Sequence, residues 1–229
     1  MRSVLLLAFG VVGACANSGD EPMLILGNTA QAAGAVDCIY TGDPSQPITS
    51  SGMISVASPM GYIVSPLIQS RITSPMGQEL TRTIEVQGAT VELSIPNGSP
   101  SVPLASNESA FQALFSVDIA PQGTANVSFE LIPSSVIQSV ANLGSTSPVS
   151  VEVVANLTLF GTMGGSRVTG QPWQYPVTIC NDCVVVDHGP CPLTITLVRT
   201  GDPCNVYQDG QVDCCDDPAN GLTCPGTTM

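Results

Sequence analysis

The residues with the clearest capacity for chemistry lie close together near the C-terminus. Cys180, Cys183, His188 and Cys191 bring three thiols and one imidazole into a short stretch of chain. Ligands of these types at such spacings can bind zinc in a tetrahedral arrangement. The same cysteines can instead form disulfides if the chain is exported into oxidising conditions. The acidity of the chain and the five other cysteines that remain apart from Cys15 favour disulfides, so zinc is the less favoured alternative.

Eight of the nine cysteines remain when Cys15 is set aside, and an even number in an exported chain predicts four disulfides. Adjacent Cys214 and Cys215 cannot bond each other without strain, so we expect each to reach a different partner. Cys38 lies far upstream of the others, and its bond is expected to join the N-terminal region to the C-terminal segment. The sequence leaves the remaining connectivity open. The disulfide candidates are Cys38, Cys180, Cys183, Cys191, Cys204, Cys214, Cys215 and Cys224.

Aspartates crowd the same C-terminal segment and offer a second kind of metal site. Calcium prefers oxygen ligands of this type, supplied by carboxylates and loop carbonyls. The spacing does not match an EF-hand loop, and a solvated acidic surface is the favoured interpretation. We therefore expect no cofactor, with calcium as the alternative. The calcium candidates are Asp209, Asp213, Asp216 and Asp217.

Catalytic motifs do not emerge from the sequence. It contains no GxSxG, P-loop or HExxH pattern, and a serine hydrolase would have to use the single histidine, His188. We therefore predict that the chain is not an enzyme. Trp173 and Tyr175, in the run Gln-Pro-Trp-Gln-Tyr-Pro, could form an aromatic binding patch. Packing in the core or at a sheet edge is favoured, because the prolines that flank this run indicate an edge strand.

The composition excludes several classes of function. The 229-residue chain has 18 acidic residues against five basic ones, all arginine, for a formal net charge of −13. Such a balance argues against a nucleic acid partner, because that binding depends on cationic side chains. Because the chain has no lysine, it cannot use a lysine amine to form a Schiff base with a carbonyl substrate or cofactor. With 43% hydrophobic residues and only 10% charged ones, the chain should fold rather than remain disordered.

The N-terminus reads as an export signal. Arg2 is followed by the apolar run Val4–Val12, which is too short to span a bilayer, and by small residues before Cys15. The ending Val-Gly-Ala-Cys resembles a bacterial lipobox. That resemblance implies removal of residues 1–14 and lipidation of Cys15, whose acyl chains would anchor the protein in a membrane. Ala16 is not the aspartate associated with inner-membrane retention, so the outer membrane is the expected location, on its periplasmic face or at the cell surface.

The rest of the chain must position these groups, and its dominant pattern is period-2 alternation, typical of half-buried strands. We expect a tether over 15–46, in which only the apolar run 23–26 could dock or form a strand. A Cys-rich acidic segment is expected over 180–229. Between them, 47–179 is predicted to be an all-β, antiparallel, Ig-like β-sandwich. Its strands are expected at 48–56, 62–70, 81–95, 111–119, 125–132, 149–159 and 167–179, with a helix at 134–143.

Two local features of that body are specific. The apolar positions of 81–95 change from even to odd numbers at Gly88, so a β-bulge is expected there to keep them on one face. The glycine-rich stretch 161–165 is expected to turn strand 149–159 into a hairpin.

Together with a lysine-free composition rich in Ala, Gly, Val and Pro, the chain resembles envelope lipoproteins of myxobacteria. The expected function is binding or structural, with the membrane as one partner and an envelope protein or surface polymer as another. A metal-binding extracytoplasmic module and a secreted hydrolase are the alternatives.

Overall fold

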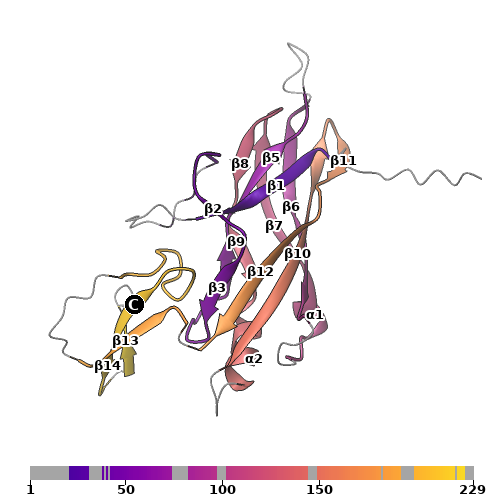
Figure 1. Ribbon diagram of the computed structural model, residues 1–229. Helices are drawn as coiled ribbons and strands as arrows, with labels where there is room; N and C mark the ends of the chain where they lie inside the picture. Colours follow the sequence, from indigo (N-terminus) through magenta and orange to yellow (C-terminus); the bar gives the residue numbers. More distant parts are fainter. Residues whose placement is uncertain are drawn as a thin grey trace, which may run out of the picture.

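The computed structural model describes residues 21–30, 38, 40, 42–73, 82–96, 102–143, 149–181, 183–191, 199–219 and 221–224. Cys15 and the expected signal peptide lie outside these residues. Strands dominate the described chain, as predicted (Figure 1). The elements are β1 (Met23–Thr29), β2 (Ile48–Thr49), β3 (Gly52–Ser55), β4 (Tyr62–Val64), β5 (Pro66–Ser70), β6 (Ile84–Ser94), α1 (Ser106–Ser109), β7 (Ala110–Ile119), β8 (Thr124–Asn126), β9 (Phe129–Ile132), α2 (Ser134–Leu143), β10 (Ser150–Met163), β11 (Ser166–Thr169), β12 (Trp173–Cys180), β13 (Val185–Pro190), β14 (Val212–Asp217) and β15 (Gly221–Thr223).

The larger sheet has six strands in the order β3-β12-β10-β6-β7, with β11 paired to β10. Its central strand β10 alternates as the sequence predicts, with Val151, Val153, Ala155, Leu157 and Leu159 buried and their neighbours turned outward. The expected hairpin is confirmed, because β10 turns into β11 at two glycines that both have positive φ angles. Such a pair matches the right-handed twist of a two-residue hairpin turn.

The expected bulge in β6 is confirmed. The register of β6 against β10 shifts between Phe160 and Gly161, and its register against β7 shifts between Val86 and Gly88. Ile84 and Val86 before the shift, and Ala89 and later odd-numbered residues after it, all lie in the core. The extra residue therefore keeps one apolar face along a strand whose sequence changes phase.

The second sheet has four strands in the order β2-β1-β5-β8. Its strand β1 corrects the expected tether boundary, because Met23–Thr29 belongs to the folded body rather than to a linker. Met23 and Ile25 are buried in the core, and the strand pairs with β5 along most of its length. The short apolar run 23–26 is thus part of a core strand. The run has too few alternating positions for the sequence pattern to predict this.

Three predicted strands are each split in two. The ranges 48–56, 62–70 and 125–132 divide into β2 and β3, β4 and β5, and β8 and β9, and the members of each pair join different sheets. At one break Ser65 precedes a proline, and its N–H donates to the Asn28 side chain at 2.7 Å instead of to a neighbouring strand. Short polar interruptions therefore act as corners where the chain crosses between sheets.

The sandwich body was expected to be antiparallel, and this is wrong for one strand pair, because β3 runs parallel to β12. In the C-terminal segment, β13 also runs parallel to β14. Both pairs are joined by long connections, which parallel pairing requires and hairpins do not provide.

One apolar core joins the two sheets. It contains residues of β1 and β5 from the smaller sheet, of β6, β10 and β12 from the larger, and of α2. Helix α2 has the predicted bounds and buries Val136, Ile137 and Val140. No helix in the described ranges has the length and apolar character needed to cross a membrane.

The C-terminal segment forms a small sheet of its own, β13-β14-β15, that lies beside β3 (Figure 1). Its core is small and contains Val212 with Cys214 and Cys224, packed by Val185 and Tyr207. This small apolar core is not enough to stabilise a segment of this size. Covalent bonds must therefore contribute to its stability.

Candidate functional site

The eight candidate cysteines form four disulfides: Cys38–Cys204, Cys180–Cys183, Cys191–Cys215 and Cys214–Cys224. Cys214 and Cys215 reach different partners, as expected, and Cys38 is bonded to the C-terminal segment. Several disulfides in one chain indicate an oxidising, extracytoplasmic environment.

The zinc arrangement is not assembled in this structure. Cys180 and Cys183 bond each other, and Cys191 bonds Cys215, so none of the three offers a thiolate. His188 Nε2 lies 3.0 Å from the carboxylate of Asp213 instead. Among the described residues, His188 forms no hydrogen bond with a serine hydroxyl.

The calcium candidates are also dispersed. The buried Asp213 carboxylate accepts a hydrogen bond from the backbone N–H of Arg199 at 2.9 Å and lies 3.4 Å from the guanidinium Nε of the same residue. Asp209 faces the body of the protein, and Asp217 bonds the N–H of Ala219 at 2.7 Å. Over the ranges that the structure covers, no three His, Cys, Asp or Glu side chains gather into a possible metal site.

The loop before β14, residues 205–209, docks on β3 and β4. The Gln208 side chain accepts from the Ile63 N–H at 2.8 Å and donates to the Ile63 carbonyl at 2.7 Å, so it continues β4 as a strand would. Asn205 donates to Ser58 at 3.0 Å and to the carbonyl of Gly61 at 3.2 Å. Both amides are buried, and they tie the acidic segment to the body.

A chain of buried hydrogen bonds runs inward from this loop, and we call it the tyrosine network: Asp209, Tyr62, Tyr175, Thr49 and Asn28. The Tyr62 hydroxyl donates to Asp209 at 2.6 Å and lies 3.1 Å from the hydroxyl of Tyr175. Tyr175 is in turn 2.9 Å from Thr49 Oγ1, and Asn28 donates to it at 3.1 Å. The network joins both sheets to the C-terminal segment, with both tyrosines completely buried.

Asp209 closes the outer end of this network. The residue lies at the surface with its carboxylate turned inward, and it accepts from the Met53 N–H at 2.8 Å. Desolvation of that carboxylate raises its pKa to about 6, with Asp202 adding to the rise and the bonds from Tyr62 and Met53 opposing it. Burial likewise raises the pKa of Tyr62, so its hydroxyl remains a donor.

The Trp173–Tyr175 motif belongs to this packing rather than to an exposed aromatic patch. Trp173 is partly buried and stacks on Tyr175 with ring centroids 4.9 Å apart. The expected edge strand is right only for the first half of β12, because β3 pairs with Val177–Cys180 alone. Pro176 lies just before the residues that pair with β3. Because β3 does not pair at this position, the N–H that proline lacks is not needed for a hydrogen bond to β3.

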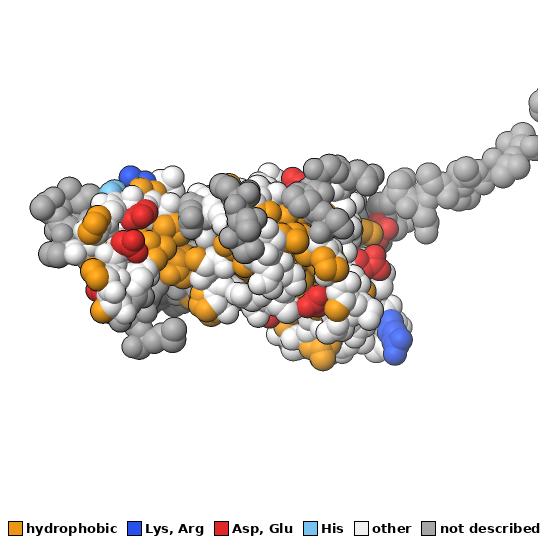
Figure 2. Space-filling view, turned by 90° about the horizontal axis from the view of Figure 1, so that it is seen from below, with side chains coloured by type: hydrophobic (Ala, Val, Ile, Leu, Met, Phe, Trp, Pro, Cys, Tyr) orange, Lys and Arg blue, Asp and Glu red, His pale blue; other side chains and the backbone are white. Residues whose placement is uncertain are grey.

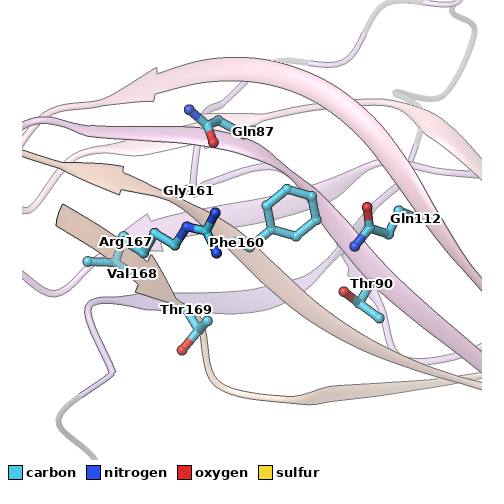
Figure 3. Close-up of a pocket in the computed structure, with 8 residues that line it drawn as sticks. All are labelled: Gln87, Thr90, Gln112, Phe160, Gly161, Arg167, Val168 and Thr169. Atoms are coloured by element: carbon cyan, nitrogen blue, oxygen red, sulfur yellow. The ribbon is translucent and has the colours of Figure 1, made fainter. Parts of the chain in front are cut away.

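A pocket of about 410 Å³ opens on the outer face of the larger sheet (Figure 3). Phe160 of β10 lies at its centre, opposite Gly88 of β6 in the strand register. A Cβ at Gly88 would come within 2.7 Å of the Phe160 ring, so only a glycine at this position leaves room for the ring. The other residues that line the pocket are Gln87, Thr90, Gln112, Gly161, Arg167, Val168 and Thr169.

The polar side chains that line this pocket have no interaction partner among the described residues. Within the described ranges, the amides of Gln87 and Gln112, the hydroxyls of Thr90 and Thr169, and the guanidinium of Arg167 make no hydrogen bond or ion pair. Figure 3 shows them arranged around the Phe160 ring. The pocket can therefore pack one apolar face of a ligand on the ring and offer donors and acceptors around it.

These pocket residues were not predicted. The one available signal was Phe160, an aromatic residue at an even position of a strand whose core residues are odd. Gln87 gave no signal, because it is brought to the surface by the bulge, and Arg167 reaches the pocket only through the β10–β11 hairpin. Figure 2 shows one face of the molecule, which is covered mostly by uncharged side chains with scattered hydrophobic ones and few charged ones.

Comparisons with known proteins leave the family open. No protein-family model and no curated protein sequence matches the chain. Among solved structures, a protein from Archaeoglobus fulgidus is similar over 57% of this chain and 94% of its own, at 13% identity and a TM-score of 0.36.

Proposed function

We propose that this chain is a lipid-anchored envelope protein that binds a surface polymer, with saccharide as the ligand class. The observation that carries the binding role is the outer-face pocket, in which one aromatic ring is surrounded by uncommitted amide, hydroxyl and guanidinium groups. The proposed anchor is Cys15, on the lipobox resemblance, and the proposed location is the outer membrane.

The proposed scaffold is an Ig-like β-sandwich. Two sheets that share one core, six strands in the larger sheet and connections that cross between sheets support this assignment. A sandwich leaves the outer face of each sheet free of core packing, so such a face can carry a binding site.

The pocket chemistry favours a saccharide over other polymers. A sugar ring presents a C–H face that packs on an aromatic ring and hydroxyls that pair with amides and hydroxyls. Phe160 supplies the ring, while Gln87 and Gln112 supply amides on two different strands. Arg167, the one cation among the lining residues, adds five N–H donors for hydroxyl or carboxylate oxygens.

Binding to envelope polysaccharides, measured by calorimetry on the purified chain after a saccharide array, tests this role. Phe160→Ala should weaken binding by about tenfold, because it removes the stacking surface. Thr158→Ala is the matched control, since Thr158 lies on the same outer face of β10 and does not line the pocket. No binding to any saccharide, or binding that Phe160→Ala leaves unchanged, would rule the site out.

The proposed anchor has a separate test. Cys15→Ser should abolish incorporation of labelled palmitate and move the protein from the membrane to the soluble fraction, because the acyl chains are lost. Ala16→Ser, one residue away, should leave both labelling and fractionation unchanged. A Cys15→Ser protein that still carries palmitate would show that the lipid is attached elsewhere or that the resemblance misleads.

A further inference from the structure

The two ends of the larger sheet are treated differently. At one end, β3 is covered by the C-terminal segment: Asp209 N–H donates to the Met53 carbonyl at 2.8 Å, and Ser55 N–H donates to the Tyr207 carbonyl at 2.9 Å. At the other end, β7 pairs with β6 along Ala110–Ile119, and in the described ranges its second side makes no backbone hydrogen bond. Within the described residues, this edge of ten residues, about 33 Å long, therefore has no strand paired to it; β8 and β9 contact β7 without forming a ladder with it.

β7 lacks most devices that prevent edge pairing. Natural edge strands are commonly short, or carry lysine or proline. β7 has ten residues, no proline and no basic side chain, and its single charge is Asp118 near the end. Its Leu114 side chain is 76% exposed, the highest value among the exposed large hydrophobic residues. The register shift opposite Gly88 leaves its alternation of outward and inward residues intact.

We propose that β7 pairs antiparallel with β7 of a second copy of this chain, about a two-fold axis at Leu114. In this register no like charges are opposed, and the residues that face the core meet apolar residues of the second copy. Leu114 meets Leu114 of the second copy and loses its exposure to water. The other opposed pairs are Ala110 with Asp118, Gln112 with Ser116, Phe111 with Val117, and Ala113 with Phe115.

The charge of the chain sets the character of this dimer. Each copy carries a formal net charge of −13, so two copies repel each other at a distance while the strand edges attract at contact. Salt screens the repulsion beyond about 10 Å at 0.1 M and leaves the strand hydrogen bonds in place. The dimer should therefore be weak and concentration-dependent, and it should tighten as salt is added.

Sedimentation of the full chain at rising protein concentration tests the pairing. Leu114→Lys should weaken the dimer by about tenfold, because it removes the apolar contact and opposes two like charges at the axis. Leu143→Lys, at the exposed end of α2, is the matched control and should leave the dimer unchanged. A dimer that is weakened by added salt would contradict the expected charge dependence.

Hydrogen exchange locates the contact. Amides of β7 should exchange more slowly at high than at low protein concentration, whereas those of the covered edge strand β3 should not change. A chain that stays monomeric at submillimolar concentration overturns the proposal. A dimer that Leu114→Lys leaves intact, or whose β7 amides exchange as fast as in the monomer, overturns it as well and places the interface elsewhere.

Discussion

Replacing Cys38 and Cys204 together by serine should lower the free energy of unfolding by about 5 kcal/mol. The bond spans 166 residues, and the entropy that a crosslink removes from the unfolded chain grows with the length of the closed loop. It is also the disulfide that ties the C-terminal segment to the N-terminal part of the body. Its loss should therefore weaken both the fold and the docking of residues 205–209.

The matched control is the double serine variant at Cys214 and Cys224, whose bond closes a separation of 10 residues. The same relation gives about 3 kcal/mol for that loop, so the two variants should differ by about 2 kcal/mol. Guanidinium unfolding under non-reducing conditions measures both. Equal losses for the two variants would show that loop length does not govern the contribution of these bonds.

Gly52→Ala should lower the free energy of unfolding by about 3 kcal/mol, because the site has no room for a methyl group. A Cβ at Gly52 would lie 2.1 Å from the Tyr62 hydroxyl and 2.3 Å from the ring carbon that bears it. Tyr62 cannot move aside without breaking its bonds to Asp209 and Tyr175. The glycine is therefore needed for the parallel strand β3 to pass over this tyrosine.

Thermal unfolding, followed by the fluorescence of the single tryptophan, measures the effect, since Trp173 stacks on Tyr175 of the same network. Ser51→Ala, at the exposed neighbouring position, should change stability by less than about 0.5 kcal/mol. Tyr62→Phe should cost about 1 kcal/mol, because it removes hydrogen bonds without a clash. A Gly52→Ala variant no less stable than Tyr62→Phe would contradict the steric argument.

The features that were predictable from sequence are those coded locally. The bulge at Gly88 follows from a change of phase within one strand, and α2 follows from its own periodicity and boundaries. The β-rich character follows from alternation over many strands. Each of these depends on residues that are neighbours in sequence, so the pattern contains the information.

The features that were missed depend on contacts between distant residues. Asp209 and Tyr62 are separated by 147 positions and Tyr62 and Tyr175 by 113, and no local pattern marks a tyrosine for a buried hydrogen bond. The run 23–26 was too short to show alternation, although its burial in β1 makes it part of the core. The split strands were missed for the same reason, because contacts with distant residues determine which sheet each half of a split strand joins.

The early start of β1 has a geometric consequence for the proposed anchor at Cys15. Only seven residues separate that cysteine from Met23, and a fully extended chain of that length reaches about 25 Å. With an anchor at Cys15, the start of β1 would therefore lie within about 25 Å of the bilayer surface. Gly170 and Gln171, next to β11, lie beside the start of β1, because the Gln171 N–H bonds the Met23 carbonyl at 3.0 Å. β11, which carries Arg167 and Thr169 of the pocket, would then be the strand near the bilayer, whereas the aspartate-rich segment lies far from β11 in Figure 1.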